Sequence, residues 1–118
     1  MNPAELLTSG FRGAVVMVVG GHGDIGSAVC RQAIELGATV IAASRRSHDP
    51  DAVPHTAVQS VTLDITSTDS VRAALSFIER THGRIDVLVN AAGSTATVPA
   101  SDIHRLSDEV VDEVLASN

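Results

Sequence analysis

The chain has 118 residues, of which 44% are hydrophobic and 19% are charged, and its formal net charge is −6. This length suits one domain over residues 1–118, and the apolar fraction is too high for a disordered chain. The acidic balance argues against a nucleic-acid partner or an anionic membrane surface, and no apolar run approaches the ~20 residues that cross a bilayer.

The single cysteine, Cys30, excludes an internal disulfide, and the first residues show no basic start followed by a long apolar stretch. We therefore expect a cytoplasmic protein. Histidines are scattered without metal-ligand spacing, so no metal site is predicted. All eight basic residues are arginines and tyrosine is absent, so no residue of this chain can act as a phenol acid or an amine nucleophile.

Apolar runs and helical periodicity alternate along the first half of the chain. Ala14–Val19 is a continuous β-branched run, which predicts a strand buried on both faces. After a glycine cluster, apolar residues at helical spacing from Ile25 to Leu36 predict a helix that ends at Gly37. Thr39–Ala43 is the second predicted strand, and a proline-containing loop is expected over Ser44–Thr56.

The second half repeats this order. Ala57–Leu63 predicts a third strand, and Thr66–Asp69 matches a capping box before an amphipathic helix that ends at Gly83. Ile85–Val89 predicts a fourth strand. A loop over Ala91–Leu106 then leads to a last helix capped by Ser107, whose expected buried side is Val110, Val111, Val114 and Leu115. Strands joined by helical crossovers predict an α/β fold with a doubly wound parallel sheet of four strands.

Glycines at 20, 21, 23 and 26 lie between the first strand and the first crossover helix, and Gly21, Gly23 and Gly26 match G-x-G-x-x-G. In this position glycines permit a sharp turn and let backbone amides and the helix dipole approach a pyrophosphate, as in Rossmann-like folds. The alternative is a glycine-rich turn without a ligand. Asp24 would repel a phosphate if it pointed inward, so we expect it to face outward or to cap the helix. His22 is interpreted as a solvent-facing turn residue, and the alternative is that it contacts a phosphate.

Ser44, Arg45 and Arg46 stand at the end of the second strand, where an NAD-specific site usually has a carboxylate. Two guanidinium groups at this position can clamp a 2′-phosphate, which favours NADP over NAD. The alternative is an ordinary solvated arginine pair.

Three motifs resemble the short-chain dehydrogenase/reductase family, over essentially the whole chain from Gly13 onward. They are Val19-Gly20-Gly21-His22-Gly23-Asp24-Ile25-Gly26, then Leu63-Asp64-Ile65-Thr66, and Asp86-Val87-Leu88-Val89-Asn90-Ala91-Ala92-Gly93.

The resemblance implies a set of contacts with the cofactor. Gly20, Gly23 and Gly26 would line the pyrophosphate, and the Ile25 backbone would contact the cofactor. Ser44 and Arg45, with Arg46 as a second cation, would hold the 2′-phosphate. Asp64, beside the Ile65 backbone, would bind the adenine amino group. Asn90 would stabilise the central sheet, Ala91, Ala92 and Gly93 would pass close to the adenosine ribose, and Asn118 would belong to the catalytic group.

The chain departs from the family pattern at several positions. Val19 replaces the usual threonine, and glycines at 20, 23 and 26 are closer to the extended branch, whereas Asn90–Gly93 is typical of the common one. The family's catalytic serine and Tyr-x-x-x-Lys would lie further along than this chain extends.

These observations predict the NADP-binding part of an oxidoreductase that transfers hydride between the nicotinamide and a small carbonyl or alcohol substrate. The alternatives are a non-catalytic dinucleotide-binding module and an inactive fragment. The resemblance also implies the strand order 3-2-1-4, in which Ile85–Val89 without a fifth strand would be an exposed apolar edge, so self-association is expected as well.

Overall fold

The computed structural model describes residues 1–45, 58–94 and 98–118. Within these ranges, no helix is both long and apolar enough to cross a bilayer. Strands and helices alternate after a short N-terminal helix. The elements are α1 (Pro3–Ser9), β1 (Val15–Val19), α2 (Asp24–Glu35), β2 (Thr39–Ser44), β3 (Val58–Thr62), α3 (Thr68–His82), β4 (Val87–Asn90), the 3-10 helix η1 (Ala100–Arg105) and α4 (Asp108–Ser117).

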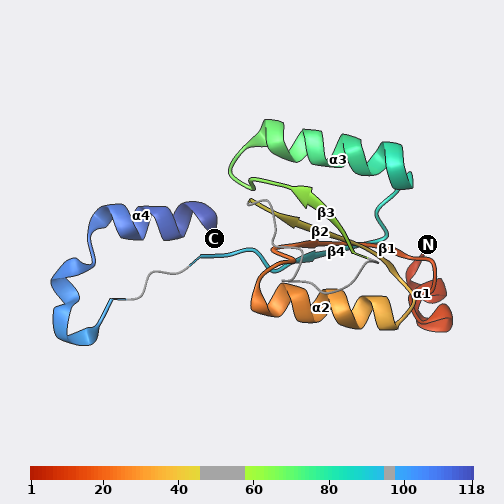
Figure 1. The fold of residues 1–118 in the computed structure, drawn as a ribbon, viewed down its shortest axis with the longest axis horizontal. Helices are drawn as coiled ribbons and strands as arrows, with labels where there is room; N and C mark the ends of the chain where they lie inside the picture. Colours follow the sequence, from red (N-terminus) through yellow and green to blue (C-terminus); the bar gives the residue numbers. More distant parts are fainter. Residues whose placement is uncertain (46–57, 95–97) are drawn as a thin grey trace.

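The four strands form one parallel sheet in the order β3-β2-β1-β4, which confirms the predicted order. At the carboxyl end of β1, Val19 lies opposite Ala43 of β2 and Asn90 of β4. Helix α2 covers one face of the sheet and α3 the other (Figure 1). The strand order reverses at β1, because β2 lies on one side of it and β4 on the other, and such a switch point is where these sheets bind ligands.

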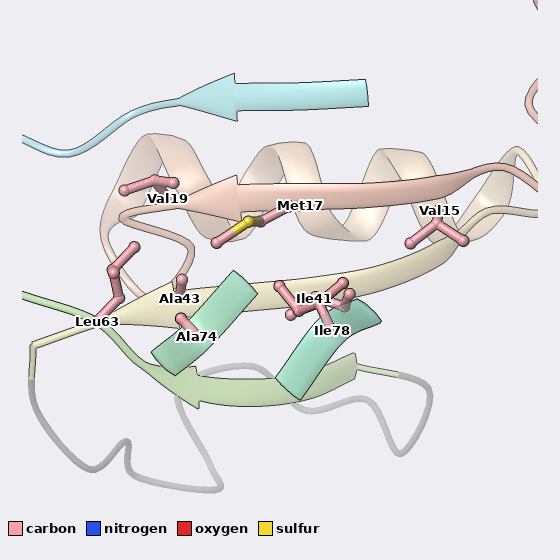
Figure 2. Close-up of a cluster of buried hydrophobic side chains, with 8 residues drawn as sticks. All are labelled: Val15, Met17, Val19, Ile41, Ala43, Leu63, Ala74 and Ile78. Atoms are coloured by element: carbon pink, nitrogen blue, oxygen red, sulfur yellow. The ribbon is translucent and has the colours of Figure 1, made fainter. Parts of the chain in front are cut away.

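The sequence of β1 is apolar without interruption because all five of its residues are buried. Its alternate side chains face opposite layers. Val15, Met17 and Val19 pack in a cluster with Ile41 and with residues of α3 (Figure 2). The other β1 side chains, Val16 and Val18, pack in a second cluster with Cys30 and Ala33 of α2.

Helices α2 and α3 end as predicted, at Gly37 and Gly83, whereas the start of α3 differs from the prediction. Gly37 follows α2 with a φ of +88°, as expected for a glycine at a helix end. The capping box predicted at Thr66 is wrong by one residue, because Ser67 is the N-cap of α3 and its hydroxyl accepts the Ser70 N–H at 3.2 Å. The Thr66 hydroxyl instead donates to the Asp64 carboxylate at 2.6 Å, a charge-assisted bond.

The last helix begins as predicted but does not pack as predicted. The Ser107 hydroxyl accepts the Val110 N–H at 3.3 Å. However, α4 buries none of its residues, and Leu115, expected on a buried side, is 70% exposed. The chain leads away from the sheet through η1, so that α4 lies beside the sheet and not on it (Figure 1).

Two elements were not predicted, α1 and η1, and the second lies in the segment expected to be a loop. For α1 a signal was present, because Asn2 and Glu5 form a reciprocal cap with backbone-to-side-chain hydrogen bonds of 2.8 and 2.9 Å. Strand β4 begins two residues later than predicted and ends at Asn90. Most of the loop predicted over Ser44–Thr56 lies outside the described residues.

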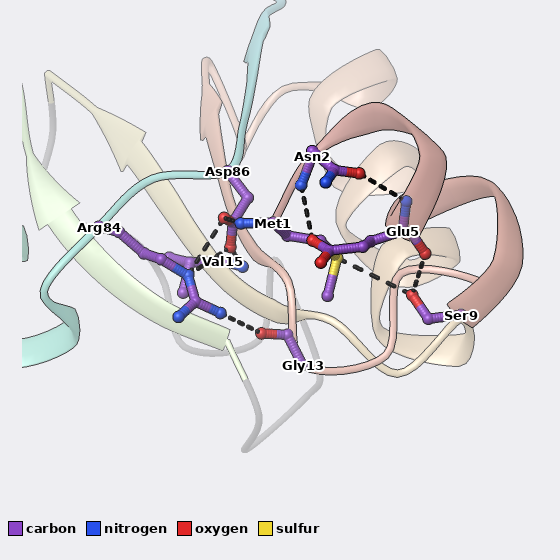
Figure 3. A network of polar contacts seen from close by, with 8 residues as sticks. All are labelled: Met1, Asn2, Glu5, Ser9, Gly13, Val15, Arg84 and Asp86. Atoms are coloured by element: carbon purple, nitrogen blue, oxygen red, sulfur yellow. Dashed lines mark hydrogen bonds and ion pairs between the residues drawn. The ribbon is translucent and has the colours of Figure 1, made fainter.

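Asp86 joins the amino ends of β1 and β4 at the edge of the sheet opposite the strand carboxyl ends (Figure 3). Its carboxylate accepts the Val15 N–H at 2.8 Å, the Met1 ammonium at 2.9 Å and the Arg84 Nε–H at 2.9 Å. Arg84 also donates to the Gly13 carbonyl at 3.2 Å. The side chain of Asp86 is only 3% exposed. The Val15 N–H, followed by the Met1 ammonium and Arg84, lowers the pKa of Asp86 far below its ordinary value.

Candidate functional site: a cavity at the strand carboxyl ends

A cavity of about 660 Å³ opens where the strands end and the crossover segments begin. All four strands contribute to its wall, either directly or through the residues that follow them. Its lining residues are Val19, Gly20, His22, Gly23, Ala43, Ser44, Arg45, Leu63, Ile65, Thr66, Ala91, Ala92, Gly93, Ser94 and Ser117. Several predicted site residues are thus brought together: Gly20, Gly23, Ser44, Arg45, Ile65, Ala91, Ala92 and Gly93.

Three glycines of the loop between β1 and α2 are required by the fold itself. Gly20 has a φ of +79°, and a Cβ on it would lie 2.7 Å from the Ala91 backbone. A Cβ on Gly21 would lie 2.6 Å from the Cβ of Ala42, and one on Gly26 would lie 2.0 Å from the Gly20 carbonyl oxygen. These contacts leave no room for a side chain at any of the three positions.

Gly23 is different, because it has an extended backbone and space around it. It is the N-cap of α2 with a φ of −77°, and the nearest atom to an added Cβ is the Gly20 carbonyl oxygen at 3.4 Å. A Cβ at this position would therefore fit the protein without a clash. Gly23 itself lines the cavity at the N-terminus of α2, where first-turn amide groups have no partner within a helix.

Neither Asp24, Ile25 nor Gly26 lines the cavity. Asp24 is exposed, in agreement with the expectation that it faces outward, and Ile25 is 75% exposed on the first turn of α2. Gly26 acts through packing, since its Cα hydrogen atoms face the Gly20 carbonyl where a side chain would clash.

At the end of β2, Ser44 and Arg45 both line the cavity. Arg45 is exposed, so its guanidinium is accessible to a ligand. Arg46, the second predicted cation, lies outside the described residues.

Asp64 follows β3 and does not line the cavity, although its neighbours Ile65 and Thr66 do. Its Oδ1 accepts the Thr66 N–H at 2.9 Å in addition to the Thr66 hydroxyl. The Thr66 hydroxyl and N–H, with the nearby Arg45 cation, lower the pKa of Asp64. Asp64 is therefore ionised and shapes the turn that brings Ile65 and Thr66 to the cavity.

The segment after β4 forms the opposite wall. Asn90 does not line the cavity, and its side-chain Oδ1 accepts the Ala92 N–H at 3.3 Å. This bond holds the turn in which Ala91 and Ala92 approach Gly20. The Ala91 N–H also donates to the Val19 carbonyl at 2.8 Å, which extends the pairing of β1 and β4 by one residue.

Asn118 lies beside this wall without lining the cavity. Its side-chain amide accepts the Ser94 N–H at 3.3 Å and donates to the Ser94 carbonyl at 2.7 Å. Gly93 leaves space for this amide, since a Cβ there would lie 2.5 Å from the Asn118 Oδ1. The preceding residue, Ser117, thereby reaches the cavity wall.

Sequence reasoning missed several lining residues. His22 is half-buried, with its Nε2 at 3.2 Å from the Ser60 hydroxyl of β3, so its interpretation as a solvent-facing residue is wrong. The bond to Ser60 turns the ring toward the sheet. Ser117 was also missed, because its approach to Ser94 joins segments 23 residues apart and depends on the position of α4.

Comparisons with known proteins agree with this architecture. A sequence model of the family described as short chain dehydrogenase matches residues 14–118. An uncharacterized oxidoreductase of Schizosaccharomyces pombe is 34% identical over 107 residues, which cover 90% of this chain and 40% of that protein.

Two solved structures resemble the fold closely. A short chain dehydrogenase from Mycobacterium smegmatis has a TM-score of 0.76 and 32% identity, covering 92% of this chain and 47% of that one. A short chain dehydrogenase from Leptospira borgpetersenii with bound NAD+ has a TM-score of 0.73 and 25% identity, covering 93% and 42%. The chain thus spans less than half the length of these relatives. By its sequence motifs, its sheet order and these matches, the chain belongs to the short-chain dehydrogenase/reductase family of oxidoreductases, which use NAD(P) as cofactor.

Proposed function

We propose that this chain binds NADP and forms the cofactor-binding portion of an oxidoreductase that transfers hydride between the nicotinamide ring and a carbonyl or alcohol substrate. The observation that carries the proposal is a single cavity whose wall contains both Gly23 and Arg45. The fold has room for a side chain at Gly23, so the advantage of glycine there is that it leaves space for a ligand at the N-terminus of α2.

Arg45 supports the choice of NADP over NAD. It follows β2, where NAD-specific folds usually have a carboxylate that binds the ribose hydroxyl groups. In this position a guanidinium forms charge-assisted hydrogen bonds with a 2′-phosphate. Ser44, beside it in the cavity wall, supplies a hydroxyl group.

The remaining predicted residues fit supporting roles. The loop from Gly20 to Gly26 would hold the pyrophosphate, and Asp64 would hold the turn that presents the Ile65 backbone to the adenine. Asn90 would hold the turn that presents Ala91, Ala92 and Gly93 to the adenosine ribose. When bound, the cofactor supplies or accepts the hydride, and Asn118 is assigned here a positioning role through Ser94.

The second candidate function is dinucleotide binding without catalysis. It is favoured by the absence of tyrosine and lysine from the 118 residues, since within them no phenol or amine can transfer a proton to a substrate oxygen. We therefore propose that the 118-residue chain alone binds the dinucleotide and does not catalyse hydride transfer.

Substitution of Arg45 by alanine tests the cofactor assignment by calorimetric titration with NADP and NAD. A charge-assisted bond to phosphate contributes about 1.5–3 kcal/mol, so the Kd for NADP is expected to rise about ten- to hundredfold while that for NAD changes little. Arg80→Ala, an exposed arginine on α3 away from the cavity, is the matched control. Equal weakening of both dinucleotides would contradict the role of Arg45.

A larger residue at Gly23 tests the loop assignment separately. Gly23→Val should leave the chain folded and should abolish binding of both dinucleotides. Its thermal melting should reflect a loss of no more than about 1 kcal/mol, because the first added carbon atom fits the fold and valine is only a poorer N-cap residue than glycine. Retained affinity would show that the loop does not contact the phosphates.

We also propose that copies of the chain associate through β4. Leu88 on this strand is 62% exposed, and β4 pairs only with β1 among the described strands. Size-exclusion chromatography should show a dimer or larger species that Leu88→Arg converts toward the monomer. A monodisperse monomer at high concentration would refute this association.

A further inference from the structure

Two serine hydroxyl groups meet at the side of the cavity formed by β4 and α4. Ser94 follows β4, Ser117 is the last residue of α4, and their Oγ atoms are hydrogen-bonded to each other. Both residues line the cavity. Ser117 Oγ also donates to the Glu113 carbonyl at 3.0 Å. Because one hydroxyl donates one hydrogen, Ser94 is then the donor within the pair, and the lone pairs of its oxygen can accept from a ligand.

The position of this pair is set by Asn118 and not by helix packing. Helix α4 buries none of its residues. Its C-terminal end is fastened by the Asn118 amide, which donates to the carbonyls of Ser94 and Val114 at 2.7 and 2.6 Å and accepts the Ser94 N–H. These bonds join the C-terminal end of α4 to the segment after β4, and so they hold the two hydroxyl groups at the cavity wall.

The Ser94–Ser117 pair and the Arg45 guanidinium belong to opposite sides of the cavity. Arg45 follows β2 and Ser94 follows β4, with β1 between these strands. Neighbouring strands lie ~4.8 Å apart, so the two walls are separated by roughly 10 Å along the sheet. Since Arg45, Gly23 and Ser94 line one cavity, a dinucleotide with its 2′-phosphate at Arg45 and its pyrophosphate at Gly23 would extend toward β4 with its second ribose.

From this arrangement we infer that the Ser94–Ser117 hydroxyl pair binds the ribose of the nucleoside beyond the pyrophosphate, accepting a hydrogen bond from a ribose hydroxyl. The inference rests on the proposed dinucleotide binding and assigns a contact for the half of the cofactor that Arg45 and Gly23 do not reach.

The test compares two ligands that differ in that half, NADP and adenosine 2′,5′-bisphosphate, by calorimetric titration. Ser117→Ala and Ser94→Ala should each raise the Kd for NADP about two- to tenfold, the range of one neutral hydrogen bond, and leave the Kd for the bisphosphate unchanged. Ser101→Ala, an exposed serine of η1 outside the cavity wall, is the matched control. The bisphosphate also reports whether each variant retains the adenosine site.

The double variant Ser94→Ala/Ser117→Ala should weaken NADP binding little more than either single change, because the two hydroxyl groups act as a unit. Unchanged affinity for NADP in both single variants would overturn the inference, and so would equal losses for the two ligands. If the unaltered chain binds NADP no more tightly than it binds the bisphosphate, the inference fails, whereas the proposed adenosine site is retained. Binding of neither ligand would refute the proposed function itself.

Discussion

Replacement of Asp86 by alanine should destabilise the chain far more than replacement of an exposed aspartate. The carboxylate is 3% exposed and accepts the N–H of Val15, the first residue of the buried central strand. A hydrogen bond to a charged group contributes about 1.5–3 kcal/mol, and the pair with Arg84, which is 54% exposed, adds at most about 1 kcal/mol. The expected loss is therefore about 1.5–4 kcal/mol of unfolding free energy at neutral pH.

Urea denaturation followed by far-ultraviolet circular dichroism measures this loss, since the chain has neither tryptophan nor tyrosine for fluorescence. Asp112→Ala, an exposed position on α4, is the control and should change the unfolding free energy by less than about 0.5 kcal/mol. Equal midpoints for the Asp86 and Asp112 variants would refute the structural role of Asp86.

The pH dependence gives a second check on the same residue. The pKa of Asp86 is lower in the folded chain than in the unfolded chain, where it is ~3.9. Its stabilisation is therefore complete above the unfolded pKa and is lost as the pH falls toward the folded pKa. The difference in unfolding free energy between the unaltered chain and the Asp86→Asn variant should be constant from pH 7 to about 5. It should become smaller below about pH 4. A difference that stays constant down to pH 2 would contradict this explanation.

Three further substitutions test the glycine loop, the N-cap of α3 and the hydrophobic core. Gly26→Ala should destabilise the fold by at least about 2 kcal/mol in urea, because its Cβ would overlap the Gly20 carbonyl oxygen; full stability would contradict the loop geometry. Ser67→Ala should lower the unfolding free energy by about 1 kcal/mol, measured by thermal melting, because it removes the N-cap of α3, and an unchanged melting temperature would contradict that cap. Ile78→Ala, at 1% exposure in the α3 core, should cost about 2–5 kcal/mol in urea, whereas a loss below 1 kcal/mol would contradict its burial.

Local sequence determined most of the fold. The unbroken apolar run of β1 requires burial on both faces, and such strands occur in parallel sheets covered by helices on each side. Glycines after β1 and Gly37 after α2 have backbone requirements that few other residues meet, so they mark turns in the sequence itself. Family motifs then supplied the sheet order and the position of the cofactor loop, since no periodicity states which strands are neighbours.

The candidate site was predicted only as a set of residues near strand ends. The sequence cannot show that Gly26 is required by packing while Gly23 has room for a side chain, because that difference depends on how closely the loop folds back on Gly20. It also cannot show that Thr66 binds Asp64 and leaves the cap to Ser67, since both hydroxyl groups lie within reach of the same helix end.

Contacts between distant segments were decided by the tertiary structure alone. Asp86 meets Val15 from 71 residues away, and Asn118 meets Ser94 from 24 residues away. The apolar spacing of α4 predicted a buried face, but the path of the chain through η1 holds that helix beside the sheet. Periodicity records which side of a helix is apolar, whereas burial requires a surface to meet it, and only the three-dimensional path of the chain determines whether one is there.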